Sequence, residues 1–98
     1  MVLATKENDQ IIMENNCEAR MGMPCVWEVF DNIFKTGCIS HKCCGELLSL
    51  GKLCHAAFVK RTLEDPLFKD LKPSVIIPKS IQAWNTCLVE IHSLSPSA

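Results

Sequence analysis

The sequence has no long hydrophobic run and no excess of charge of either sign, and each absence excludes a class of protein. The 98-residue chain carries a formal net charge of −1, whereas a nucleic-acid-binding domain normally shows a stripe of basic residues. No apolar stretch reaches the roughly 20 residues that a membrane-spanning helix requires. The most apolar segment, Leu47 to Val59, is interrupted by Lys52 and His55. We therefore expect a soluble domain with no nucleic-acid partner and no membrane span.

The sequence also lacks internal repeats and the alternation of apolar and polar residues that is typical of a β-strand. Apolar residues make up 48% of the chain, which excludes a disordered polypeptide, and the length fits one domain. Apolar residues instead recur at helical spacing in separate segments. These segments are Ile11 to Met23, Cys25 to Lys35, Ser40 to Leu63 and about Ser80 to His92. The pattern predicts an all-α domain of four helices.

Polar or proline-rich stretches set the predicted boundaries. We expect residues 1–12 to form a flexible N-terminal tail, residues 13–92 to form the domain, and residues 93–98 to form a flexible C-terminal tail. Leu67 to Lys79 is expected to be an ordered loop, because prolines punctuate it, with room for one turn of helix at Leu67–Leu71. Ser40 is the predicted N-cap of the helix that follows it.

Cysteine is the residue type that most distinguishes this sequence. Seven cysteines in 98 residues are typical of small secreted domains held by disulfides and unusual in cytosolic proteins. Cys43 and its neighbour Cys44 point about 100° apart on a helix, so they face different parts of the chain. Six cysteines fall on predicted helices, and spacing alone leaves 15 ways to pair them. The six are Cys17, Cys25, Cys43, Cys44, Cys54 and Cys87, and the seventh is Cys38.

The expected location is extracellular, although the start of the given chain carries no recognisable signal peptide. Residues Met1 to Thr5 are too short for a charged region followed by an apolar region. We expect either a mature form with a start methionine or a longer precursor.

One group of residues carries a resemblance to a known family. The group is Cys17, Cys25, Phe34-Lys35-Thr36-Gly37, Cys43-Cys44, Leu47, Gly51-Lys52, Cys54-His55 and Trp84-Asn85-Thr86-Cys87. The order C…C…CC…C…C on helices resembles the prolamin superfamily of plants, which includes lipid-transfer proteins and seed storage albumins. It resembles more closely the plant prolamin-like domain of the egg-cell-secreted and gametogenesis-related cysteine-rich proteins. The resemblance extends from Cys17 to His92, and Cys38 is additional to its six-cysteine pattern.

The resemblance implies a fold, a pairing and a function. The fold would be a disulfide-linked four-helix domain of the prolamin and lipid-transfer type. The implied pairs are Cys17–Cys54, Cys25–Cys43 and Cys44–Cys87, so that all three bridges converge on the helix from Ser40 to Leu63, and Cys38 remains as a free thiol or pairs between chains. The implied function is that of a secreted, non-enzymatic protein of plant reproductive tissue. It would act in gametophyte development or gamete signalling by binding a cell-surface partner.

Two alternatives from the same superfamily stay open. A lipid-binding or lipid-transfer protein would need an apolar cavity, and the candidate lining residues are Leu47, Leu50, Phe58, Ile76 and Ile77. A hydrolase inhibitor would need an exposed rigid loop, for which the candidate is Lys72 to Lys79. The aromatic residues, Trp27, Phe30, Phe34, Phe58 and Trp84, are expected to lie in the core.

Two constellations have the residue types of reactive sites. The residue types of a zinc site occur at His41, Cys43, Cys44, Cys54 and His55, but tetrahedral zinc normally takes paired ligands on a turn rather than diverging ones on a helix. Cys38 and His41 have the types of a Cys–His nucleophile pair, without an orienting third group or an oxyanion hole. We therefore expect no metal, no cofactor and no enzymatic activity.

Overall fold

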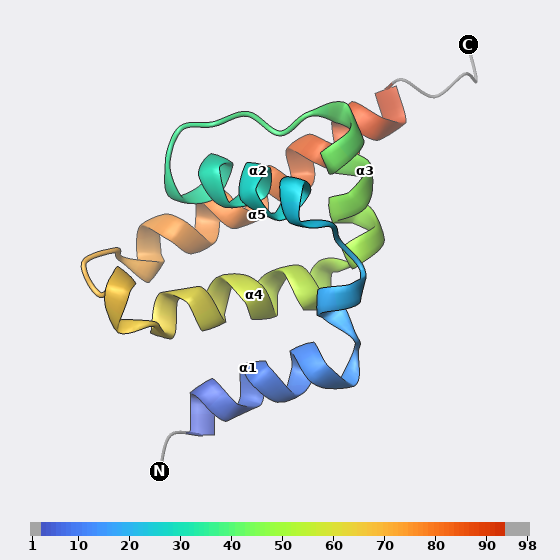
Figure 1. Ribbon diagram of the computed structural model, residues 1–98. Coiled ribbons are helices and arrows are strands. Elements are labelled where there is room, and N and C mark those ends of the chain that lie inside the picture. Colours follow the sequence, from blue (N-terminus) through green and yellow to red (C-terminus); the bar gives the residue numbers. More distant parts are fainter. Residues whose placement is uncertain (1–2, 94–98) are drawn as a thin grey trace.

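The structure is a computed structural model, and it describes residues 3–93. These residues form five α-helices and two short 3-10 helices, with no strand among them (Figure 1). The α-helices are α1 (Leu3–Glu14), α2 (Met23–Phe34), α3 (His41–Leu50), α4 (Lys52–Glu64) and α5 (Pro73–Ser93), and the 3-10 helices are η1 (Cys17–Ala19) and η2 (Pro66–Phe68). The predicted all-α fold is confirmed, but the predicted number of helices is wrong.

The helices form two layers. Helix α1 packs along α4, while α2, α3 and α5 pack against one another on the other side of α4 (Figure 1). We call α1, η1 and α4 the lower layer, and α2, α3 and α5 the upper layer. The core draws residues from both layers. Its largest buried members are Ile12, Val29, Ile33, Leu47, Leu50, Val59, Ile76 and Trp84.

The N-terminal segment is a helix, so the prediction of a flexible tail over residues 1–12 is wrong for residues 3–12. A helix of this length is marginal alone and needs tertiary packing. Ile12 supplies that packing, because it is only 4% exposed and belongs to the core. Asn8 adds a hydrogen bond from its Nδ2 to Glu64 on α4, at 3.2 Å. Residues 94–98 of the predicted C-terminal tail lie outside the described residues.

The predicted helix from Ile11 to Met23 is also wrong. Helix α1 ends at Glu14, and Asn16 adopts a left-handed conformation with φ of 53° before η1 begins. Asparagine tolerates this conformation better than most residues. Met13 and Cys17 are four positions apart but belong to two different elements. Met13 is exposed, while Cys17 is fully buried.

The predicted helix from Ser40 to Leu63 is broken at Gly51. This glycine has φ of 95° and ψ of 153°, a backbone conformation that residues with a Cβ rarely adopt. It ends α3 and begins α4. The predicted N-cap is confirmed, because the Ser40 hydroxyl accepts a hydrogen bond from the Cys43 backbone N–H at 3.3 Å. Cys54 thus lies on a different helix from Cys43, and the bridges do not converge on a single helix.

The predicted loop from Leu67 to Lys79 is largely helical. Helix α5 begins at Pro73, a first-turn position where proline's missing N–H costs nothing. The Lys72 carbonyl accepts hydrogen bonds from the N–H groups of Val75 and Ile76 at 2.9 and 3.0 Å. Pro78 removes one hydrogen bond inside α5, but packing of the segment around Ile76 holds the helix. The inhibitor hypothesis therefore loses the exposed loop that it required.

Candidate functional site

Three disulfides join distant parts of the chain. The structure links Cys17 to Cys54, Cys25 to Cys43 and Cys44 to Cys87, with Cα–Cα distances of 5.6, 5.0 and 4.9 Å. These are the same pairs that the family resemblance implies. All six half-cystines are buried, and Cys38 is a free, exposed cysteine in the segment between α2 and α3.

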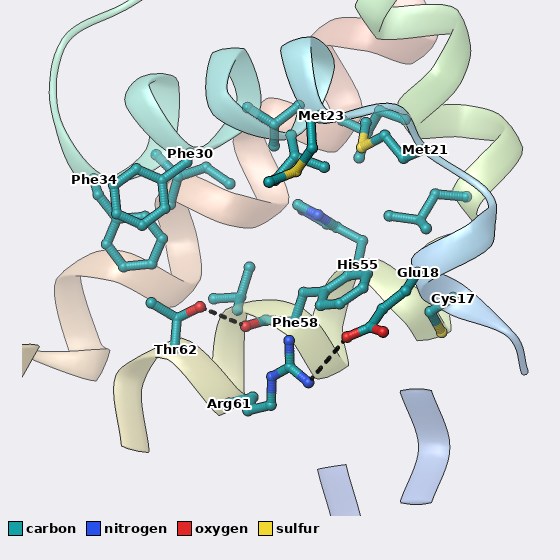
Figure 2. A pocket seen from close by; sticks show the side chains of 16 residues that line it. Cys17, Glu18, Met21, Met23, Phe30, Phe34, His55, Phe58, Arg61 and Thr62 are labelled. Carbon is teal, nitrogen blue, oxygen red and sulfur yellow. Dashed lines mark hydrogen bonds and ion pairs between the residues drawn. The ribbon is translucent and has the colours of Figure 1, made fainter. Parts of the chain in front are cut away.

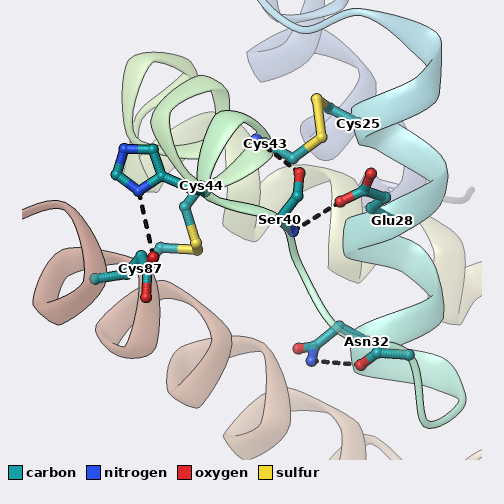
Figure 3. Close-up of a disulfide and its surroundings, with 10 residues drawn as sticks. Cys25, Glu28, Asn32, Ser40, Cys43, Cys44 and Cys87 are labelled. Carbon is teal, nitrogen blue, oxygen red and sulfur yellow. Dashed lines mark hydrogen bonds and ion pairs between the residues drawn. A yellow bond between two sulfur atoms is a disulfide. The ribbon is translucent and has the colours of Figure 1, made fainter.

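Each disulfide lies within one layer. Cys25–Cys43 joins α2 to α3, and Cys44–Cys87 joins α3 to α5, so both lie in the upper layer (Figure 3). The third bridge joins η1 to α4 in the lower layer. Within the part of the chain that the structure describes, the two layers are therefore joined by chain connections and side-chain packing, without a covalent bridge between them.

The segment that leads from α2 to α3 is held by side-chain hydrogen bonds. The Ser40 N–H donates to Glu28 Oε1 at 2.8 Å, and Asn32 Nδ2 donates to the Gly37 carbonyl at 2.9 Å (Figure 3). The hydrogen bonds from Ser40 lower the pKa of the Glu28 carboxyl. This anchoring sets the start of α3, and hence the positions of its two cysteines.

An apolar pocket of about 490 Å³ lies between the two layers. We call it the α2–α4 pocket (Figure 2). Its lining residues are Cys17, Glu18, Met21, Met23, Val26, Val29, Phe30, Ile33, Phe34, Leu47, Leu50, His55, Phe58, Val59, Arg61 and Thr62. Three of the predicted cavity residues, Leu47, Leu50 and Phe58, line it, whereas Ile76 and Ile77 do not. Both lie on α5, where Ile76 is buried in the core and Ile77 lines a hollow between α4 and α5.

The charged residues of the α2–α4 pocket are paired. Arg61 Nη1 lies 3.6 Å from Asp9 Oδ1 and 3.7 Å from Glu18 Oε2, and its guanidinium lies 5.3 Å from the centre of the Phe58 ring. Figure 2 shows Arg61 reaching toward Glu18 below the Phe58 ring. The remaining lining is dominated by aliphatic, aromatic and methionine side chains. The pocket therefore suits an uncharged, apolar group.

A row of aromatic rings runs along α2 and borders this pocket. The Phe30 ring centre lies 5.8 Å from Trp27, 4.6 Å from Phe34 and 5.8 Å from Phe68. Trp27 is 56% exposed, so the prediction that it lies in the core is wrong. Met23, one turn before it, lines the pocket and is 62% exposed. One end of the aromatic row is thus presented to solvent beside the pocket.

His55 is buried between α4 and α5. Its Nε2 lies 2.9 Å from the Ser80 carbonyl, and because a carbonyl only accepts, Nε2 carries the hydrogen. Its ring stacks on Trp84 with 6.0 Å between the ring centres. Burial lowers the pKa of His55, and the hydrogen bond to Ser80 opposes that shift. His55 is therefore held as a neutral donor to the Ser80 carbonyl.

A second hollow, of about 400 Å³, lies between α4 and α5. We call it the α4–α5 groove, and its lining residues are Lys52, His55, Ala56, Val59, Lys60, Ile77, Ser80, Ile81, Trp84 and Asn85. Sequence reasoning missed it. A pattern in the sequence could have indicated it, because residues four positions apart share one face of a helix. Lys52, Ala56 and Lys60 have this spacing on α4, and Ile77 and Ile81 have it on α5.

The residues considered for zinc do not gather into a site. Cys43, Cys44 and Cys54 belong to three different disulfides, and His41 Nδ1 lies 3.3 Å from Glu90 Oε2. Among residues 3–93, no group of three or more His, Cys, Asp or Glu residues is arranged to hold a metal ion. None of the described helices is both long enough and apolar enough to cross a membrane.

Comparison with known proteins agrees with this disulfide-linked architecture. The model of the prolamin-like family matches residues 16–88. The chain belongs to the prolamin-like family. This membership confirms the resemblance drawn from the cysteine pattern, and it fits a disulfide-stabilised, all-α fold. The family comprises small disulfide-rich proteins that are generally non-enzymatic, and this size and bridge density are consistent with secretion.

One curated relative of the chain is a plant protein. The chain is 27% identical over 73 residues to the Arabidopsis thaliana protein named Protein DOWN-REGULATED IN DIF1 11. The match covers 74% of this chain and 48% of the relative, so it spans about half the relative's length. No solved structure matches the chain. The family match and this relative support a small, cysteine-rich plant protein.

Proposed function

We propose that this protein is a secreted, non-enzymatic, cysteine-rich protein of plant reproductive tissue. It acts in gametophyte development or gamete signalling by binding a cell-surface partner. Membership of the prolamin-like family supports the proposal, because the cysteine pattern resembles that of the egg-cell-secreted and gametogenesis-related proteins. Three buried disulfides suit a small domain that must remain folded outside the cell.

The observation that carries the partner-binding proposal is the exposed apolar surface of α2. Met23 and Trp27 are more than half exposed, and Trp27 continues into the aromatic row beside the α2–α4 pocket. Tryptophan and methionine are enriched at protein interfaces, and tryptophan often supplies a large share of the binding energy. An exposed tryptophan beside an open apolar pocket is therefore a suitable anchor for a protein partner.

Cys38 offers a way to test this proposal directly. The oxidised protein, labelled through its exposed thiol, is added to isolated plant gametes and, for comparison, to leaf protoplasts. We expect saturable binding to the gametes that unlabelled protein displaces and that prior protease treatment of the cells abolishes. Absence of saturable binding, or binding that survives protease treatment, contradicts a cell-surface protein partner.

A matched pair of variants tests the α2 surface. Trp27→Ala removes the exposed ring and is expected to weaken binding to the cells by about tenfold or more, as at interface residues of this type. Val89→Ala is the control, because Val89 is 66% exposed on α5 and lines neither hollow. Equal losses in the two variants place the partner elsewhere.

The volume of the α2–α4 pocket favours lipid binding as a second candidate. About 490 Å³ of mostly apolar space falls within the usual range of small-molecule sites. We expect a fluorescent acyl probe to bind the protein, and Val26→Phe, which fills part of the pocket, to reduce that binding by severalfold. Binding that is unchanged in the folded Val26→Phe variant rules out this pocket as the lipid site.

A further inference from the structure

The α4–α5 groove differs from the pocket in that its charges are unpaired. Lys52 and Lys60 are exposed at its edge, and no ion pair among the described residues involves either of them. No acidic residue lines the groove. Its edge is therefore a place of uncompensated positive charge on a protein whose net charge is near zero.

The inner surface of the groove is apolar and firmly held. Ala56, Ile77 and Ile81 line it, and Ile81 is 55% exposed. Trp84 forms its buried wall, stacked on His55, whose ring is fixed by the hydrogen bond to Ser80. An occupant would therefore meet a preformed apolar surface, which lowers the entropic cost of binding.

Trp84 also supplies an unsatisfied donor. This residue is only 8% exposed, and its Nε1 is buried without a hydrogen-bond partner among the described residues. Buried polar groups normally have a partner, and an exception calls for an explanation. Because Trp84 lines the groove, the signal of this unpaired N–H should respond when the groove is occupied.

We propose that the α4–α5 groove binds an acidic peptide segment of a partner protein. Lys52 and Lys60 are eight positions apart on α4, which corresponds to about 12 Å along a helix. An extended peptide advances roughly 3.3 Å per residue, so two carboxylates four residues apart match the two lysines. A large apolar side chain between them would lie against Ile81 and Trp84.

This proposal does not depend on the cell-surface partner proposed above. It concerns the groove between α4 and α5 rather than the exposed surface of α2, and it is tested with peptides alone, so its failure leaves the proposed function intact. The probe is a blocked heptapeptide of serines with glutamate at the second and sixth positions and leucine at the fourth. The control peptide carries lysine in place of both glutamates.

Binding is followed by NMR through the indole N–H signal of Trp84. The chain has two tryptophans, so the signal that remains in the Trp27→Phe variant is that of Trp84. We expect a saturable shift with the glutamate peptide, and little or no shift with the lysine peptide. Lys52→Gln combined with Lys60→Gln should weaken binding by about three- to tenfold. Lys69→Gln, which removes an exposed charge outside the groove, should leave binding unchanged.

The apolar contact has its own matched pair of variants. Ile81→Ser should weaken binding of the glutamate peptide severalfold, whereas Val89→Ser, two turns further along α5, should not. The proposal is overturned if the Trp84 signal does not move, or if both peptides bind equally. It is equally overturned if Lys52 and Lys60 are needed instead for binding to anionic phospholipid vesicles or for self-association.

Discussion

The two hollows on either side of α4 share residues but differ in charge. His55 and Val59 line both of them. In the α2–α4 pocket, Arg61 is paired with carboxylates of α1 and η1, whereas the lysines of the α4–α5 groove have no acidic neighbour in its lining. One helix, α4, therefore presents a neutral apolar site on one face and a basic apolar site on another.

Reduction of the disulfides is the change with the largest expected effect, because it should remove both hollows at once. Reduction and alkylation of the three disulfides should unfold the protein, because each bridge contributes roughly 3–4 kcal/mol and a small domain is stable by only about 5–15 kcal/mol. Circular dichroism should show loss of helix and of the melting transition. Intact mass after alkylation should count one free thiol before reduction and seven after it. An unchanged melting curve after complete reduction contradicts this prediction.

A substitution in the α2–α4 pocket should alter that hollow and leave the α4–α5 groove unchanged. Leu47 is fully buried and lines only the pocket, so Leu47→Ala should lower the free energy of unfolding by about 2–5 kcal/mol and enlarge the pocket. Urea unfolding measures the first effect. Below the unfolding transition, binding of the glutamate peptide to the groove should be unchanged, and its loss in the folded variant shows that the hollows are coupled.

A fall in pH should affect His55, one of the two residues that line both hollows. Burial lowers the pKa of His55 in the folded protein, so the unfolded state, with a pKa of about 6.5, binds its proton first. The free energy of unfolding should therefore fall as the pH drops below about 6.5, by at most roughly 1.4 kcal/mol per pH unit. The effect ends at the lower folded-state pKa, and chemical denaturation at several pH values measures it.

Two variants isolate the histidine that is responsible. His55→Gln keeps a donor that can reach Ser80 but does not titrate, so it should flatten this pH dependence. His41→Gln, at an exposed position, should preserve it. Glu28, whose pKa is lowered from an already acidic value, acts only at lower pH. A slope that survives in His55→Gln shows that another group is responsible.

The smallest expected effect concerns the paired charge of the pocket. Arg61→Gln removes two ion pairs that are partly exposed, so stability should fall by less than about 1 kcal/mol. Glu18 and Asp9 then lose their cation, and the pocket entrance becomes acidic. Binding of a positively charged acyl probe should rise relative to a negatively charged one, while an unchanged preference indicates that Arg61 does not control entry.

Local patterns in the sequence predicted the features that depend on few residues. Helical spacing and the cysteine count indicated an all-α, disulfide-linked domain, and Ser40 was correctly placed as an N-cap. The break at Gly51 was not predicted, because a glycine is compatible with both a helix and a positive φ. Helix α1 was missed, because its stability depends on contact with α4 rather than on its own polar residues.

The sequence by itself determined that this chain is a helical, cysteine-rich domain of the prolamin-like pattern, with one cysteine beyond the six. Only the tertiary structure decided that the helices form two layers, that each disulfide stays within a layer, and that two hollows lie beside α4. The reason is that helical spacing records which residues share a face of one helix. How closely two helices approach depends on side chains far apart in the chain, and this approach leaves Lys52 and Lys60 beside the apolar residues of α5.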